Sequence, residues 1–308
     1  MKKNILIHPE ELNKKWIDRM ADGGVDILGI HPHGGGRAEE SLKELIEQLK
    51  TREYRELIDY AKSRGLEIEY EMHAARYLMP SALFETHPEY FREMANGERT
   101  LNMNFCVSNQ EALDIVAKNA AKLAKLLYGS RPVFYFWLDD ATNIHCKCEK
   151  CRGLSPSDQH LTAVNAMIRE IRKEIPEARL AYLAYMDSLE VPQTVKPEDG
   201  VFLEYAPIEK YKKAHPDRIE AERNMLLKQI EFFGLAGSKV LEYWLDNSLF
   251  SGWKKPPKEF VPDNVSIKKE VREYANLGFG IVSTFGCFLG DDYEELYGEA
   301  DISGYTEA

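Results

Sequence analysis

Residues 133–140 read Val-Phe-Tyr-Phe-Trp-Leu-Asp-Asp, an apolar run that ends abruptly in two carboxylates. Valine and aromatic side chains favour extended strands, and a run this short is more typical of a buried strand than of a helix. The sequence contains eight short runs of this kind, at residues 4–7, 25–30, 66–72, 133–138, 180–185, 201–205, 239–244 and 279–285. Each is predicted to form one β-strand.

Longer stretches with apolar residues at helical spacing separate most of these runs, at residues 10–21, 41–64, 110–127, 156–175, 217–233 and 266–277. Ser155, Pro156 and Asp158 provide a capping residue, a first-turn proline and an acid three residues after the cap, which predicts a helix start. Strands that alternate with helices imply a parallel sheet. Eight such units without a break in composition predict a single (β/α)8 barrel domain over residues 1–308.

The composition narrows the classes of partner. With 51 acidic and 40 basic side chains the formal charge is −11, which disfavours nucleic acid and anionic membrane surfaces. Residues 1–9 lack the apolar segment of a signal peptide, and no run reaches transmembrane length. The odd number of cysteines, five, is not typical of an extracellular disulfide framework. We therefore expect a cytoplasmic protein with reduced thiols.

Polar and aromatic side chains gather where the predicted strands end, which is where barrels of this kind hold their active sites. Carboxylates, histidines and aromatic rings suit a sugar, because rings stack on the sugar faces and polar groups bond the hydroxyls. We predict a carbohydrate-binding site from the residues His31, His33, His73, Arg76, Trp137, Asn143, Tyr185, Glu204, Tyr205, Glu242, Tyr243, Trp244 and Asp246.

Asp139 and Asp140 are the predicted catalytic residues. Two neighbouring carboxylates drive their pKa values apart, so that one can stay ionised while the other holds a proton as general acid. Successive strand residues face opposite ways, so both can reach one pocket only if the strand breaks or bulges at this point. One of them could instead cap a loop or pair with an arginine.

Glu242 is the rival catalytic carboxylate. In the run 239–244, Leu241, Tyr243 and Leu245 share one phase, and if these apolar residues face the helices, Glu242 points into the barrel. An acid on one strand paired with a nucleophilic carboxylate on another is a common retaining glycosidase arrangement. A buried structural glutamate remains the alternative.

Three thiols lie within six residues at Cys146, Cys148 and Cys151. Zinc takes four tetrahedral ligands, so one more must come from elsewhere. Cys106, in the long loop after the third predicted strand, is the first candidate and His145 the second. A structural zinc and a group of unligated thiols both stay open at this point, and we expect no cofactor for catalysis.

Several ordered motifs resemble the bacterial group catalogued as domain of unknown function 4838, part of which is classed as family-163 glycoside hydrolases. The resemblance covers most of the chain and rests on residues 84–91, 97–99, 105–109, 137–140 with 146–151, and 180–185. It implies a barrel related to the β-N-acetylglucosaminidases of families 20 and 84, in which the acetamide of the substrate is the nucleophile.

By this resemblance Asp139 would orient the acetamide and stabilise the oxazolinium ion, and Asp140 would protonate the leaving oxygen. The predicted activity is a retaining, substrate-assisted hydrolysis of an N-acetylhexosaminide. Tyr205 or Tyr243 would bond the acetamide, while Trp137 or Trp244 would wall the subsite. The chain is shorter than many members of the group, which leaves both large glycans and small saccharides open as substrates.

Three alternatives remain. The first is a glycosidase for another pyranoside or a hexuronide, with Asp140 as acid, Glu242 as nucleophile and Arg37 or Arg76 binding a sugar carboxylate. The second is a carbohydrate-binding barrel without turnover. The third is a metal-dependent isomerase or hydrolase whose ligands are His31, His33 and His73.

Overall fold

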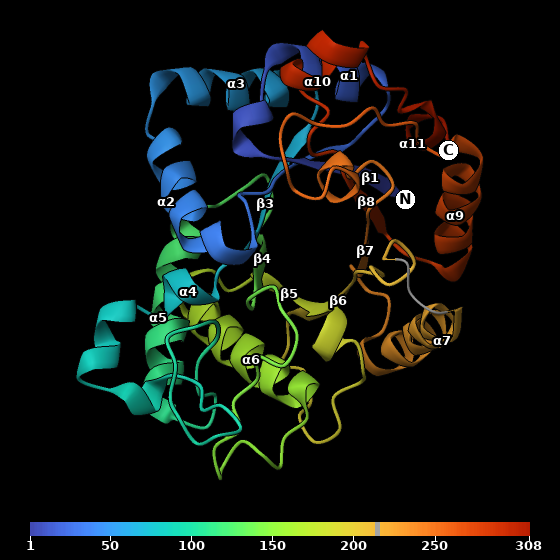
Figure 1. Cartoon of the computed structure of the whole chain (residues 1–308). Helices are drawn as coiled ribbons and strands as arrows, with labels where there is room; N and C mark the ends of the chain where they lie inside the picture. The colour runs from blue at the N-terminus through green and yellow to red at the C-terminus, as the bar shows by residue number, and fades with distance from the viewer. Residues whose placement is uncertain (213–215) are drawn as a thin grey trace.

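Eight parallel strands close into one barrel in the computed structural model, which describes residues 1–212 and 216–308 (Figure 1). The strands follow chain order, and β8 returns to pair with β1. Their bounds are β1 Lys2–Ile7, β2 Ile27–Ile30, β3 Glu67–His73, β4 Val133–Trp137, β5 Arg179–Ala184, β6 Val201–Tyr205, β7 Lys239–Glu242 and β8 Ile281–Phe285. The predicted (β/α)8 barrel is therefore confirmed, and each predicted run overlaps one strand.

Helices form a ring around the strands (Figure 1). They are α1 Lys14–Asp22, α2 Ala38–Gln48, α3 Arg52–Ser63, α4 Ala75–Leu78, α5 Gln110–Leu126, α6 Pro156–Glu174, α7 Pro216–Phe233, α8 Asn247–Phe250, α9 Asn264–Leu277, α10 Asp291–Tyr297 and α11 Ser303–Thr306. Among the described residues, no helix combines the length and apolarity needed to cross a membrane.

Local chemistry explains most helix boundaries. Ser155 caps α6 through the predicted reciprocal hydrogen bonds with Asp158. The long helix expected over residues 41–64 is wrong, because the structure has two helices, α2 and α3, with Thr51 as the cap of the second. Residues 49–51, which connect the two helices, contain no glycine or proline to mark the break. Between β5 and β6, a fully described stretch, the only helical segment is the short 3-10 turn Met186–Ser188, in line with the lack of a predicted helix between the runs 180–185 and 201–205.

The barrel interior contains a layer of charged side chains, and an aromatic residue, Trp137, lies between this layer and the carboxyl ends of the strands. Lys239, fully buried, lies 2.5 Å from Glu71 and 3.6 Å from Glu69 and Glu204, and we call these four residues the Lys239 network. A buried charge needs partners of opposite sign, which this network supplies. Trp137 donates from Nε1 to Glu204 at 2.7 Å and so separates the network from the strand ends. The Trp137 ring is held in place by this bond and forms the bottom of any site at the carboxyl ends of the strands.

Candidate active site

A cavity of about 500 Å³ opens at the carboxyl ends of the strands. All eight strands, or the residues directly after them, contribute to its wall, for example through His8, His31, His73, Trp137, Tyr185, Ala206, Tyr243 and Phe285. Its volume falls in the range of small-molecule sites, and its lining combines Phe, Tyr and Trp rings with histidines, aliphatic residues, glycines and a few charged groups. This is the position in which barrel enzymes hold substrates.

Asp140 lies in this cavity. The Tyr185 hydroxyl donates to its Oδ1 at 3.0 Å. Burial, reinforced by the nearby Tyr243 and Asp140, raises the pKa of Tyr185 well above its usual value, so this hydroxyl remains a donor. On the other side, a Cβ at Gly34 would stand only 3.7 Å from Oδ2 of Asp140 and 3.1 Å from the His73 ring. The glycine thus leaves room beside the free oxygen.

Asp139 is held away from the cavity. Its side chain is buried, Asn104 donates its backbone N–H to Oδ2 at 2.5 Å, and the Asn104 side chain accepts from the Asp139 N–H at 2.9 Å. Arg76 lies 3.8 Å away. Burial raises the pKa of Asp139, while the bond from Asn104 opposes the rise. The two aspartates therefore do not share one pocket.

A second, smaller cavity of about 60 Å³ adjoins the first and is lined by Asp139, Asn104 and His160. It has room for a few water molecules but not for a sugar ring. Asn104 holds its unusual backbone (φ 52°) beside Asp139, in a region that asparagine tolerates better than most residues. The Asn104–Asp139 pair is thus a clasp between the loops that follow β3 and β4.

Histidines form one side of the large cavity. His8, His31 and His73 each place Nδ1 against a backbone carbonyl, of His31, Glu71 and Leu138 respectively. Such contacts favour the Nδ1–H tautomer and leave Nε2 as an acceptor. Burial lowers the pKa of His8 to about 4 and that of His31 well below its usual value, so both rings are neutral at pH 7.

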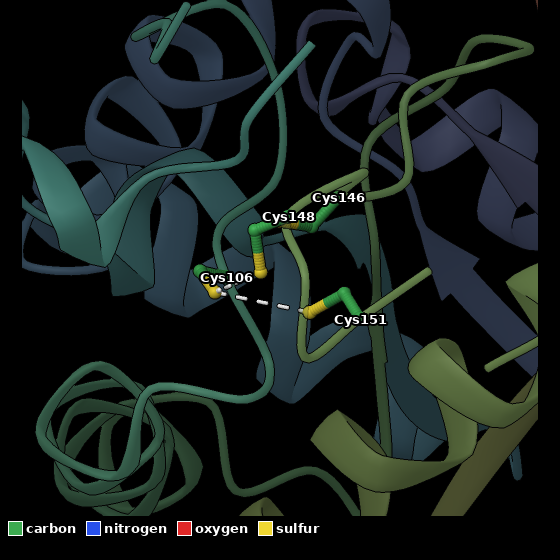
Figure 2. A group of neighbouring side chains, drawn as sticks. All are labelled: Cys106, Cys146, Cys148 and Cys151. Atoms are coloured by element: carbon green, nitrogen blue, oxygen red, sulfur yellow. Dashed lines mark hydrogen bonds between the residues drawn. The ribbon is translucent and has the colours of Figure 1, made fainter. Parts of the chain in front are cut away.

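Metal ligation by these histidines finds no support. Within residues 1–212 and 216–308, the one group of three or more histidine, cysteine or acidic side chains arranged closely enough to share an ion is a cysteine cluster elsewhere. His31, His33 and His73, the ligands in the metal-dependent isomerase or hydrolase alternative, do not form such a group among the described residues. The four cysteines predicted as zinc ligands, Cys106, Cys146, Cys148 and Cys151, do come together (Figure 2).

The predicted substrate-binding residues fall into four groups by their position relative to the large cavity. Those that line the large cavity are His31, His33, His73, Trp137, Tyr185, Tyr243 and Asp246. Two others lie near it without lining it, since Arg76 lies beside Asp139 and Asn143 donates its backbone N–H to Asp187. Glu204 is buried below the cavity in the Lys239 network, where it fixes Trp137 rather than touching a ligand.

Three predicted site residues point out of the barrel toward the surrounding helices: Tyr205, Glu242 and Trp244. Their prediction as site residues is wrong. Tyr205 donates to a carbonyl on α7, and Trp244 donates to Glu270 on α9. The direction of the side chains on β7 was misjudged because Lys239 was not expected in the barrel interior. Since alternate strand residues face the same side, Leu241 and Tyr243 face inward with Lys239, and Glu242 faces the helices. Glu242 cannot reach the cavity as a nucleophile.

We expect Glu242→Gln to leave kcat and KM within about twofold of the parent and to lower the free energy of unfolding by roughly 1–3 kcal/mol. The buried Glu242 carboxylate accepts from Lys210 at 2.7 Å and from Tyr211 and Tyr274 at 2.6 Å, and glutamine cannot satisfy all three donors. Urea unfolding with parallel kinetics measures both quantities.

Glu270→Gln is the control, because Glu270 shares Lys210 but is partly exposed and should cost less stability. A stable but inactive Glu242→Gln protein would restore Glu242 as a catalytic residue.

Asp246 is the second carboxylate of the large cavity. Its Oδ1 caps α8 by accepting from the N–H groups of Ser248 at 3.0 Å and Leu249 at 3.2 Å. Burial raises its pKa to about 6, and the bonds from Ser248 and Leu249 limit the rise. Its primary visible role is structural, although it faces the same space as Asp140.

Three features of the cavity were missed from the sequence: Trp253, Phe285 and the segment 34–36. Trp253 is 66% exposed although it lines the cavity, which is unusual for so large an apolar side chain. Phe285 packs on Tyr243 with ring centroids 5.2 Å apart. The three consecutive glycines after His33 were the one available signal, since glycine permits close approach of backbone to a ligand.

Comparisons with known proteins agree with this fold. A model of the family described as domain of unknown function (DUF4838) matches residues 46–282. No curated protein matches the sequence.

Among solved structures, a β-galactosidase from the psychrophilic Marinomonas ef1 is similar, with a TM-score of 0.54 and 14% identity over 92% of this chain, which spans 54% of that protein. The catalytic modules of the pneumococcal exo-β-D-N-acetylglucosaminidase StrH, of family 20, give a TM-score of 0.52 and 14% identity, covering 99% of this chain and 82% of theirs. A family-18 chitinase from Pseudoalteromonas aurantia gives 0.50 and 11%, covering 96% and 95%. At these identities the likeness shows a shared barrel fold.

Proposed function

We propose that this chain, which belongs to the family described as domain of unknown function (DUF4838), is a glycoside hydrolase that cleaves β-N-acetylhexosaminides in the cavity that holds Asp140. The observation that carries the proposal is one carboxylate, bonded on a single oxygen, at the edge of a sugar-sized and aromatic-lined space. The barrel shared with several glycoside hydrolases supports the class of reaction.

Asp140 serves as the general acid. Because Tyr185 occupies Oδ1, the proton for the leaving oxygen sits on Oδ2, which faces the open space beside Gly34. Once the leaving group has departed, the same carboxylate accepts a proton from the incoming water. Tyr185 holds the carboxyl group at a fixed angle through both steps.

The acetamide of the substrate serves as the nucleophile. Tyr243 lines the cavity, and burial raises its pKa well above its usual value, so its hydroxyl stays protonated and can donate to the acetamide oxygen, which orients that oxygen for attack on the anomeric carbon. Asp139 does not line the large cavity, so direct contact with the acetamide is not assigned to it. We assign it the role of positioning Asp140 through its hydrogen bonds with Asn104. Trp137 forms the apolar floor.

A second mechanism uses Asp246 as a nucleophile in place of the acetamide. One observation favours it: Asp246 and Asp140 are the two carboxylates of the same cavity. A hexuronide substrate has less support, since Arg37, the arginine that lines the cavity, already lies near Glu40 and Glu44. In both alternatives, Asp246 as nucleophile or a hexuronide as substrate, the reaction is still glycoside hydrolysis.

A panel of aryl glycosides tests the proposal. Release of the aryl alcohol from the β-N-acetylglucosaminide or β-N-acetylgalactosaminide is the expected result. Saturable binding of these sugars with no release over long incubation would instead identify a carbohydrate-binding barrel without turnover.

Trp253→Ala is expected to raise KM about tenfold while kcat changes little. An exposed indole beside the cavity offers a face on which a sugar ring can stack, and loss of such a contact costs on the order of 1 kcal/mol. Steady-state kinetics separate the two constants. Trp253→Phe should keep most of the affinity, and an unchanged KM for Trp253→Ala would exclude the indole from the subsite.

A further inference from the structure

Four buried cysteines from two separate loops meet beside the active site. Cys106 belongs to the loop between β3 and α5, and Cys146, Cys148 and Cys151 belong to the loop between β4 and α6 (Figure 2). All four thiols are free, and their Sγ atoms lie within 4.8 Å of one another. His145, the other candidate ligand, turns away and contacts Lys147 and Asp187.

The sulfur spacing matches a tetrahedral metal site. Four sulfurs bound about 2.3 Å from one zinc ion stand about 3.8 Å apart, because that is the edge of the tetrahedron. Cys106 Sγ lies 3.7 Å from Cys148 Sγ and 3.8 Å from Cys151 Sγ. A disulfide would need about 2.0 Å. Small rotations of the cysteine side chains would therefore suffice to place all four sulfurs at zinc-binding distance.

Hydrogen-bond donors surround the sulfurs. The Glu93 N–H points at Cys146 Sγ at 3.3 Å, and the Arg99 guanidinium lies 3.8 Å from the same atom. The Cys151 thiol donates to Ser108 Oγ at 3.0 Å, and loss of the thiol proton on metal binding would leave the hydroxyl to donate to the sulfur. Four thiolates around one zinc ion leave two net negative charges, which such donors and a guanidinium stabilise. Buried unligated thiols would have no need for this shell.

The backbone that carries the cysteines is fixed independently of any ion. Gln159, buried on α6, accepts from the Cys146 N–H at 2.9 Å and donates to the carbonyls of Cys146 at 3.0 Å and Cys151 at 3.3 Å. The Cys151 N–H bonds the Cys148 carbonyl at 3.0 Å and closes a tight turn. Ligands held in place in this way lose little entropy when the metal binds.

We propose that Cys106, Cys146, Cys148 and Cys151 bind one structural zinc ion that joins the loop after β3 to the loop after β4. Four thiolate ligands leave no position for water or substrate, so the ion takes no part in the chemistry. Cys106, one of the four ligands, is two residues after Asn104 in the sequence. The hydrogen bonds of Asn104 hold Asp139 next to the catalytic Asp140. The metal site does not depend on the proposed glycosidase activity.

Elemental analysis of the full-length protein, purified with reductant and without chelator, tests the site. The expected result is one zinc per chain that resists dialysis and is released when a mercurial reagent titrates the thiols. Replacement by cobalt should give the charge-transfer and intense d–d bands of a tetrahedral tetrathiolate. Negligible zinc, no uptake of added zinc or cobalt, and four freely reactive thiols would overturn the proposal, and iron at the site would overturn the assignment to zinc.

Cys148→Ser should lose the bound zinc and unfold at a lower temperature, since structural zinc contributes directly to folding. Cys287→Ser is the matched control, because Cys287 is equally buried but lies outside the cluster, and it should keep one zinc per chain. Should Cys148→Ser fail to fold, the cobalt spectrum of the parent protein decides the question. Full zinc retention in a folded Cys148→Ser protein counts against the four-thiolate site.

Discussion

Replacing Asp140 with asparagine is expected to lower kcat/KM by roughly 10² to 10⁴-fold for substrates with a poor leaving group. The amide cannot donate the proton that the leaving oxygen needs, yet it can still accept the Tyr185 hydrogen bond, so the fold should be kept. Activated aryl glycosides, whose departure needs little protonation, should lose far less. Comparing a disaccharide with a nitrophenyl glycoside measures the difference.

Asp139→Asn is the matched comparison, because the neighbouring aspartate is buried in the Asn104 clasp and has no access to the leaving group. Its loss should slow both substrates by a similar factor, through poorer placement of Asp140. If Asp139→Asn showed the leaving-group dependence and Asp140→Asn did not, the two roles would have to be exchanged.

Tyr243→Phe is expected to reduce kcat/KM for an acetamido substrate by about 10²-fold, the scale on which misplacement of a reacting group slows a reaction, because the hydroxyl orients the acetamide oxygen for attack. The ring should stay in place, since it packs against Phe285 and Tyr211. The effect should appear mainly in kcat, because the hydrogen bond aligns the acetamide for attack and contributes little to holding the sugar in the cavity.

Tyr205→Phe provides the control for this variant. Tyr205 donates to the Glu222 carbonyl behind the barrel, so its loss should change stability slightly and kinetics hardly at all. Equal kinetic losses in both variants would mean that Tyr243 acts through the fold and does not touch the acetamide.

The barrel was predictable because strand and helix periodicity are local properties that repeat along the chain. The run that ends in Asp139 and Asp140 also placed the candidate site at the carboxyl end of β4, where the large cavity opens. Strand bounds differ by a few residues, as expected where only flanking hydrogen bonds decide an end. The meeting of Cys106 with Cys146, Cys148 and Cys151 could be predicted because three closely spaced cysteines lie in a loop next to the loop that contains the fourth.

The direction of side chains was harder to predict. On β7, apolar residues were expected to face the helices, but the barrel interior also contains apolar residues, and a buried lysine with three carboxylates reverses the usual pattern. Asp139 was expected in the pocket with Asp140, and the deciding contact comes from Asn104, 35 residues earlier in a loop. Such long-range polar contacts leave no periodic signal in the sequence.

A matched pair of aryl β-glycosides that differ only at C2 tests the central proposal most directly. The acetamido sugar carries the nucleophile of a substrate-assisted reaction, while the plain glucoside does not. We expect kcat/KM for the acetamido substrate to exceed that for the glucoside by at least about 10³-fold, in line with the gain from an intramolecular nucleophile. Equal rates for the two substrates, together with an inactive Asp246→Asn protein, would contradict substrate assistance and establish Asp246 as the nucleophile.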